Sequence, residues 1–275
     1  MQNAGIADLG LNWRYLAFEV HPENLRAALE GAKVMGFVGV NLTVPHKLLA
    51  LEMLDVLDES ARTWGAVNTV RFEARDGQGA WRPVHEFESI PQQIRSHGFN
   101  TDADAISRAI REELGVDLRG AKVLLLGAGG AGRTAALKLA SENLEEIFLV
   151  NRTVSKAEVV AGEIAARQRG LKVQVGYPSG RVDLVINATS VGLKPVDGLP
   201  FDGTQFALRN AVAVYDMIYR PAETALLKTA KSAGCRTANG LGMLLFQGAK
   251  ALELWSGRPA PIEVMRRSLE KNIYG

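Results

Sequence analysis

Residues 122–132 read KVLLLGAGGAG, a short apolar run followed directly by a glycine-rich turn. The run has the length and composition of a strand that is buried on both faces of a parallel sheet. The turn carries G-x-G-x-x-G at Gly127, Gly129 and Gly132, and a helix is expected to begin at Gly130. The first glycine permits the tight turn, the second lets backbone N–H groups approach a pyrophosphate, and the third allows close packing of helix and strand. The sequence therefore predicts a dinucleotide site at the helix N-terminus, with a turn that serves packing alone as the alternative.

Similar units follow on the C-terminal side of this turn. Strands that alternate with helices predict βαβ units, a parallel sheet and right-handed crossovers. The fold class is therefore α/β, with a Rossmann-type doubly wound parallel sheet. Strands are expected at Glu146–Val150, Leu171–Val175, Leu184–Asn187 and Ala213–Asp216, and helices at Gly130–Glu142, Ser155–Arg169 and Glu223–Ala233.

The end of the second predicted strand indicates which dinucleotide is bound. An NAD site would place Asp or Glu there to bind the ribose hydroxyls. This chain instead has Asn151, Arg152 and Thr153, with Lys156 one turn later. Guanidinium and ammonium groups suit the 2′-phosphate of NADP, which a carboxylate would repel. We therefore predict NADP, the alternative being that Arg152 is an ordinary exposed residue at a strand end.

The first hundred residues have shorter elements. They predict a smaller α/β domain with a mostly parallel sheet, and Glu73–Ser96 is expected to be a long loop because it contains several Gly and Pro and no clean period. Two further helices are expected at the C-terminal end. The expected strands are Phe18–Val20, Phe37–Thr43 and Val67–Phe72, and the expected helices are His21–Gly31, Lys47–Leu57, Leu241–Trp255 and Ile262–Ile273.

The composition limits the class of protein. At about 150 residues per domain, 275 residues suggest two domains. The 47% apolar and 23% charged residues exclude a disordered or collagen-like chain. A net charge of +2 argues against a dedicated nucleic-acid binder, and no apolar stretch approaches the roughly 20 residues that cross a membrane. With the lone Cys235 and no visible signal peptide, we expect a cytoplasmic protein. The histidines show no metal-ligand spacing, so no metal is predicted.

Two charged residues stand out in the first hundred positions. Lys47 follows a strand and a proline, and Asp102 lies at the entry to the helix that leads into the nucleotide-binding part. Taken alone, Lys47 could be a solvated cation in the first turn of a helix, and Asp102 could be only an N-cap.

Taken together with six further segments, they resemble the shikimate dehydrogenase family over nearly the whole chain. Eight family motifs occur here in order. They are N-V-T-x-P-x-K at Asn41–Lys47 (with Leu42 in place of Val), A-V-N-T at Ala66–Thr69, N-T-D at Asn100–Asp102, G-A-G-G-A at Gly127–Ala131, N-R-T at Asn151–Thr153, N-A-T-S-x-G at Asn187–Gly192, Y-D-x-x-Y-x-P at Tyr215–Pro221 and G-x-x-M-L-x-x-Q-G at Gly240–Gly248.

The resemblance implies reversible NADPH-dependent reduction of 3-dehydroshikimate, with Lys47 and Asp102 as the catalytic pair. An ammonium held by a carboxylate can donate a hydrogen bond to the ketone oxygen as hydride arrives, and then pass the proton. The substrate contacts that it implies are Asn41, Thr43, Asn68, Tyr219 and Gln247. The cofactor contacts are Gly127, Ala128, Gly129, Gly130, Ala131, Asn151, Arg152, Thr153, Lys156, Thr189, Ser190, Met217, Gly240 and Met243.

The matches also imply a domain division. Residues 1–102 and 239–275 would form the substrate domain, with substrate bound in a cleft between the domains, and residues 103–238 the inserted NADP-binding domain. The family carries H-S-x-S-P ahead of the segment that Met1–Gly5 resembles, so we expect the chain to begin just after that motif. It also has Ala103 and Ala105 where the family usually has Gly.

Other functions and states stay open at this point. The chain could be a quinate or amino-shikimate dehydrogenase, or a catalytically impaired nucleotide-binding homologue. The expected partner is a small-molecule substrate, without nucleic acid or membrane, and the sequence leaves monomer and homodimer open.

Overall fold

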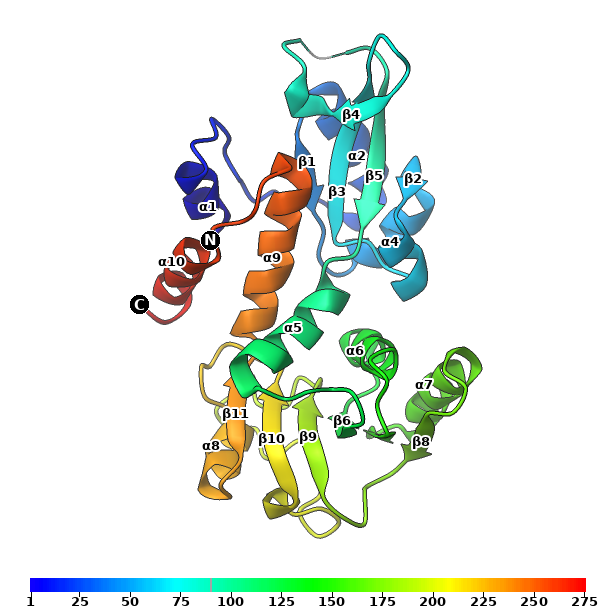
Figure 1. Cartoon of the computed structure of the whole chain (residues 1–275), viewed down its shortest axis with the longest axis vertical. Coiled ribbons are helices and arrows are strands. Elements are labelled where there is room, and N and C mark those ends of the chain that lie inside the picture. The colour runs from blue at the N-terminus through cyan, green and yellow to red at the C-terminus, as the bar shows by residue number, and fades with distance from the viewer. Residues whose placement is uncertain (90) are drawn as a thin grey trace. The chain divides into compact units, whose positions relative to one another are not determined.

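The computed structural model describes residues 1–89 and 91–275, which form two compact units (Figure 1). Unit 1 consists of Met1–Asp102 and Leu245–Asn272, and unit 2 of Ala103–Leu244 and Ile273–Gly275. The first boundary lies between Asp102 and Ala103. The second boundary lies inside the helix Leu241–Ser256, after Leu244, whereas the sequence analysis predicted it between residues 238 and 239.

Unit 2 contains a six-stranded sheet in the order β11-β10-β9-β6-β7-β8, and each of its described pairings is parallel. Beginning from the central β6, the chain adds strands first on one side and then on the other. This reversal at β6 and β9 is the topological switch of a doubly wound sheet, which confirms the predicted Rossmann-type α/β class. The strands are β6 Lys122–Leu126, β7 Glu146–Val150, β8 Lys172–Val175, β9 Val182–Asn187, β10 Ala211–Asp216 and β11 Arg236–Asn239.

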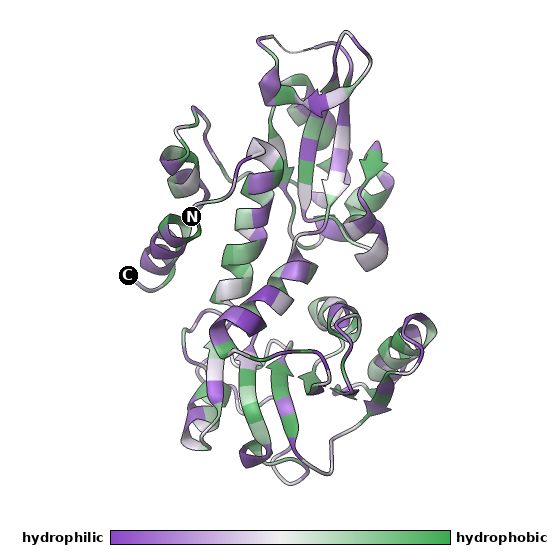
Figure 2. Cartoon of the chain, in the orientation of Figure 1, coloured by the Kyte–Doolittle hydropathy of each residue, from purple (hydrophilic) through white to green (hydrophobic). Residues whose placement is uncertain are grey.

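In unit 2, α5 precedes β6, and α6, α7 and α8 follow β6, β7 and β10. Strands β6, β7, β9 and β10 are buried along most of their length, and the hydrophobic character of β9 and β10 is visible in Figure 2, whereas the edge strands β8 and β11 are exposed or partly buried. Leu124, Val185 and Val214 pack on one face with Leu226 and Leu227 of α8. The helices are α5 Asp102–Leu114, α6 Gly130–Ala140, α7 Val154–Arg167 and α8 Ala225–Ser232, with a 3-10 turn at Leu208–Asn210.

Unit 1 contains a mixed five-stranded sheet. Its strands pair in the order β1-β3-β5-β2, with β4 also paired to β3. Among the described pairings only β2 with β5 is parallel, so the mostly parallel sheet that we predicted here is wrong in strand direction. The strands are β1 Gly39–Asn41, β2 Val56–Leu57, β3 Thr69–Arg75, β4 Trp81–Pro83 and β5 Ile94–Phe99.

One face of this sheet packs on helices and the other carries charge. Val70, Phe72 and Ala74 of β3 are fully buried in the core of unit 1. On the opposite face the Glu73 carboxylate, 3% exposed, is paired with Arg71, Arg95 and His97. The helices are α1 Gln2–Asp8, α2 Leu25–Val34, α3 His46–Leu49, α4 Glu59–Trp64, α9 Leu241–Ser256 and α10 Ile262–Tyr274, with 3-10 turns at Pro22–Asn24, Ala50–Glu52 and Val84–Glu86.

Three local predictions in unit 1 are wrong. Phe18–Val20 is not a strand, and Phe18 is 64% exposed because no ladder covers it. Lys47–Leu57 is not one helix: α3 ends at Leu49, and Leu51, Leu54 and Leu57 reach the core from the 3-10 turn, irregular backbone and β2 respectively. The expected loop at Glu73–Ser96 contains the end of β3, all of β4 and the start of β5. In the part of the chain that the structure describes, no helix is both long and apolar enough to cross a membrane.

Candidate functional site

Lys47 and Asp102 form an ion pair in unit 1. Lys47 lies in α3, directly after the end of β1, and Asp102 is the first residue of α5. Lys47 Nζ is 2.6 Å from Asp102 Oδ2, and the two side chains are 27% and 17% exposed. This partial burial reduces solvent screening of the pair, while the Lys47 side chain stays partly exposed. The structure thus joins two residues that lie 55 positions apart in the sequence.

Asn68 holds the other oxygen of Asp102. Its Nδ2 donates to Asp102 Oδ1 at 2.9 Å and to Thr101 Oγ1 at 2.9 Å, while its Oδ1 accepts from Thr101 N at 2.8 Å. A backbone N–H can only donate, so this last contact fixes which end of the amide faces the carboxylate. Asn68 is 2% exposed. Gln247 approaches the same amide, with Oε1 at 3.4 Å from Asn68 Nδ2.

Asn41 lies next to Asn68 at the end of β1. Its Nδ2 donates to Asn68 O and to Thr69 Oγ1, each at 3.0 Å, and its Oδ1 accepts from Tyr15 Oη at 2.9 Å. Thr43 is exposed two residues later. Tyr15 was missed by the sequence analysis because the residues around it form no helix or strand. Burial raises the pKa of Tyr15, so its hydroxyl stays protonated and keeps donating.

The glycine-rich turn of unit 2 has two kinds of glycine. Gly127 has φ of +105°, and a Cβ at Gly132 would lie 2.1 Å from Gly127 O, so the fold itself requires both glycines. A Cβ at Gly129 or Gly130 would meet no protein atom within 4 Å. These two positions are therefore not explained by packing within the protein.

The N-terminus of α6 begins at this turn. Gly129 is its N-cap, without a side-chain cap, and no acidic residue lies in the first turn. The first N–H groups of the helix and the positive end of its dipole are thus available to an anion. Ala128 N is already used, because it donates to Asn151 Oδ1 at 3.0 Å.

The segment after β7 carries the predicted basic residues. Asn151 Nδ2 donates to Thr153 O at 2.8 Å, so the Asn151 side chain ties this turn to the glycine-rich turn. Arg152 and Lys156 are exposed, and neither forms an ion pair with any residue that the structure describes. These two cations are therefore available to a ligand with negative charge.

The other predicted cofactor residues lie on loops at the carboxyl ends of the strands in unit 2. Thr189 donates from Oγ1 to Asn187 Oδ1 at 2.7 Å, and Ser190 is exposed. Gly240 is buried, and a Cβ there would lie 2.1 Å from Met217 O. Met243 is partly buried in α9. Tyr219, predicted to contact substrate, lies in unit 2, whereas Asn41, Thr43, Asn68 and Gln247 lie in unit 1.

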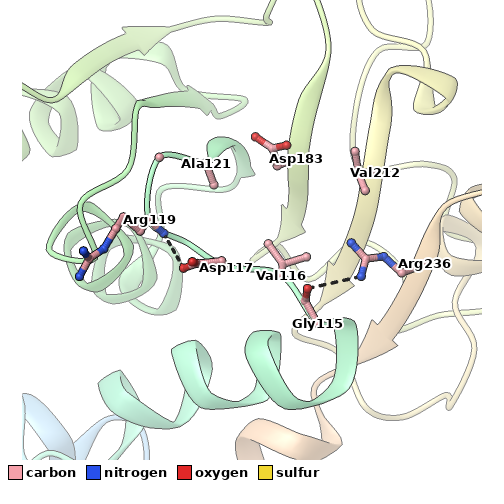
Figure 3. Close-up of a pocket in the computed structure, with 9 residues that line it drawn as sticks. Gly115, Val116, Asp117, Arg119, Ala121, Asp183, Val212 and Arg236 are labelled. Carbon is pink, nitrogen blue, oxygen red and sulfur yellow. Dashed lines mark hydrogen bonds between the residues drawn. The ribbon is translucent and has the colours of Figure 1, made fainter.

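A pocket at the amino-terminal end of the same strands of unit 2 contains none of the predicted residues (Figure 3). It lies at the amino ends of β6, β9, β10 and β11, and Asp183, Val212 and Arg236 are among its lining residues. Arg236 is turned to the end of α5, where it donates to Leu114 O at 2.5 Å. Within residues 1–89 and 91–275, no three His, Cys, Asp or Glu side chains are grouped to hold a metal ion.

Three family patterns match this chain. Residues 1–70 match the shikimate dehydrogenase substrate binding domain, residues 109–193 match shikimate / quinate 5-dehydrogenase, and residues 240–270 match the shikimate 5′-dehydrogenase C-terminal domain. A relative from Methanopyrus kandleri, named shikimate dehydrogenase (NADP(+)), is 41% identical, and the alignment covers 99% of this chain and 90% of the relative.

Solved structures of similar proteins have the same fold as this chain. A shikimate dehydrogenase in complex with NADP+ has a TM-score of 0.83 and 37% identity, covering 99% of this chain and 90% of that one. A ligand-free 5-ketofructose reductase from Gluconobacter has a TM-score of 0.80 and 35% identity, covering 98% of this chain and 92% of that one. Together with the identity over nearly the whole length, these matches show that the chain belongs to the shikimate dehydrogenase family.

Proposed function

We propose that this protein is an NADP-dependent shikimate dehydrogenase that converts 3-dehydroshikimate, NADPH and a proton into shikimate and NADP+. The observation that carries the proposal is the 2.6 Å pair of Lys47 and Asp102, with Asn68 bonded to the second carboxylate oxygen. The relative from Methanopyrus kandleri bears this activity in its name at 41% identity.

Lys47 and Asp102 divide the acid–base work. Lys47 Nζ donates a hydrogen bond to the ketone oxygen and transfers its proton there, so that the alcohol forms without a free alkoxide. Asp102 holds the ammonium in place through Oδ2. In the reverse direction, neutral Lys47 takes the hydroxyl proton. When bound, NADPH supplies the hydride for this reduction.

Residues of unit 1 have polar atoms suited to a polyhydroxylated acid. We propose that Asn41, Thr43, Asn68 and Gln247 contact the substrate hydroxyls, since amide and hydroxyl groups both donate and accept hydrogen bonds. Asn41 and Asn68 are already oriented by the contacts described above, which reduces the entropy lost when substrate binds. Tyr219 of unit 2 is proposed as a further substrate contact.

The residues of unit 2 fit NADP. The free N–H groups at the start of α6 and the open space over Gly129 and Gly130 suit a pyrophosphate. Arg152 and Lys156 supply positive charge for the 2′-phosphate. We propose that Thr189, Ser190, Met217, Gly240 and Met243 lie toward the nicotinamide end. We further propose a cytoplasmic enzyme, because the lone Cys235 cannot form an internal disulfide.

A substrate and cofactor panel tests the proposal. NADP+ or NAD+ reduction is followed with shikimate and with quinate, and NADPH oxidation with 3-dehydroshikimate and with 5-ketofructose. The proposal predicts the highest kcat/KM for the shikimate pair with the NADP form. A preference for quinate or 5-ketofructose would reassign the substrate, and NADPH binding without turnover would identify a catalytically impaired homologue.

A further inference from the structure

Asp216 is a buried carboxylate to which the proposed mechanism gives no role. It is the last residue of β10 and is 0% exposed. Oδ1 accepts from Asn187 Nδ2 at 2.9 Å and from Ile218 N at 3.0 Å, and Oδ2 accepts from Thr224 Oγ1 at 2.6 Å. All three donors are neutral, and no described residue forms an ion pair with Asp216. A carboxylate buried without a cation is costly, so its presence needs an explanation.

The two oxygens of Asp216 play different roles. Burial raises the pKa of Asp216, against three hydrogen bonds that lower it. Oδ1 faces two donors, so a proton on the carboxyl group belongs on Oδ2, where the Thr224 hydroxyl can turn to accept it. Oδ1 therefore remains an acceptor toward Asn187 and Ile218 in either protonation state.

Asn187 connects Asp216 to the loop after β9 by hydrogen bonds. Its Nδ2 donates to Asp216 and to Val191 O at 3.1 Å, while its Oδ1 accepts from Thr189 N at 3.0 Å and from Thr189 Oγ1 at 2.7 Å. Asn187 is 0% exposed. With Asp216 accepting on one side, the amide of Asn187 has one satisfied orientation, and that orientation shapes the turn from Thr189 to Val191.

This turn packs directly against the glycine-rich turn. Ala188 N donates to Leu126 O at 2.8 Å, at the end of β6. A Cβ at Gly127 would lie 2.9 Å from both Ala188 O and Thr189 Cγ2, so any shift of the turn would move one wall of the glycine-rich turn.

A second branch leads to the loop after β10. Ile218 N donates to Asp216 Oδ1, and Ile218 O accepts from Gly240 N at 3.2 Å. Met217 N donates to Asn187 O at 2.9 Å, which joins the two branches. One carboxylate thus connects the three loops that carry Thr189, Met217 and Gly240.

We propose that Asp216 is a positioning residue for the dinucleotide site. It acts through Asn187 on the Thr189–Val191 turn and through Ile218 on the backbone of Met217 and Gly240. The identity of the ligand rests on the proposed function, whereas the role of Asp216 concerns the shape of these loops.

Three variants separate positioning from simple stabilisation, with the Kd of NADPH measured by calorimetry and Tm measured alongside. Asp216→Ala removes Oδ1 and is expected to raise the Kd about tenfold, the effect of losing one such hydrogen bond. Asp216→Asn keeps an acceptor at Oδ1 and is expected to restore the Kd to within about twofold of the unmodified protein. Thr224→Ala removes the N-cap of α8 and the contact to Oδ2, so it is expected to lower Tm and leave the Kd unchanged.

The outcomes are distinct. If Asp216→Ala does not fold, Asn187→Ser removes the hydrogen bond from the other side together with the contacts of Asn187 to Thr189 and Val191, and it is expected to raise the Kd at least tenfold. Equal Kd values in Asp216→Ala and the unmodified protein, or Kd values that follow Tm in all variants including Thr224→Ala, would overturn the inference. An unmodified protein that does not bind NADPH would instead overturn the proposed function.

Discussion

Replacing Asn68 with Asp tests how the Lys47–Asp102 pair is held. The change keeps an oxygen that accepts from Thr101 N, but it replaces the donor facing Asp102 Oδ1 with a second carboxylate oxygen. A hydrogen bond to a charged group contributes about 1.5–3 kcal/mol. Since each 1.36 kcal/mol is a factor of ten in rate, kcat/KM for shikimate should fall about 10- to 150-fold.

Binding of NADPH gives a second readout of the same variant. The Kd of NADPH should not change, because Asn68 lies in unit 1 and the predicted NADP residues lie in unit 2.

A matched variant controls for the added charge. Gln78→Glu places a negative charge on an exposed turn of unit 1 and should leave kcat/KM unchanged. A kcat/KM of Asn68→Asp within about threefold of the unmodified enzyme would show that the Asn68 amide does not support the Lys47–Asp102 pair.

Three further changes have clear expectations. Gly129→Ala should leave Tm unchanged and weaken NADPH binding, because the added Cβ meets only the space assigned to phosphate. Gly132→Ala should lower Tm, because the added Cβ meets Gly127 O. Equal losses of Tm in the two variants would contradict this. Arg152→Asp should raise the Kd of NADPH about tenfold or more and leave that of NADH nearly unchanged; equal losses in both titrations would remove Arg152 from 2′-phosphate binding. Burial would raise the pKa of Glu73, but hydrogen bonds from His97 and two arginines lower this pKa from 4.5 to about 2. At 1.36 kcal/mol per pKa unit, the ionised Glu73 contributes about 3 kcal/mol to the free energy of unfolding. This stability is present above pH 4.5 and is lost as pH falls toward 2, so urea unfolding of Glu73→Gln should show a large deficit at pH 7 that shrinks at pH 3; a deficit independent of pH would argue against the lowered pKa.

The elements of unit 2 could be predicted from sequence because their signals are local. Lys122–Leu126 and Glu146–Val150 have the predicted bounds, since each is a continuous apolar run between a polar residue and a turn. β11 was missed because Arg236–Asn239 contains only one strongly apolar side chain, Ala238, and forms a strand only through its pairing with β10.

Unit 1 was harder because its structure depends on contacts distant in sequence. The leucines from Leu48 to Leu57 have helical spacing, yet Leu48 and Leu49 are exposed, and the core takes Leu51, Leu54 and Leu57 from a 3-10 turn, irregular backbone and β2. Tertiary packing therefore overrides the local pattern. Strand direction in a sheet of short strands is likewise not encoded locally. For the site, the resemblance to the family's motifs predicted Lys47 and Asp102, but only the fold shows that Asn68 bonds to Asp102 and Tyr15 to Asn41.

The rate of NADP+ reduction by shikimate in Lys47→Ala, measured beside the Kd of NADPH for the same preparation, shows whether Lys47 is the proton donor of the reaction. Removing the general acid–base group should lower kcat about 100-fold or more. The Kd of NADPH should remain that of the unmodified protein, because the proposed NADP contacts do not include Lys47. A variant that binds NADPH normally and turns over shikimate at a nearly unmodified kcat would contradict the assignment of the Lys47–Asp102 pair.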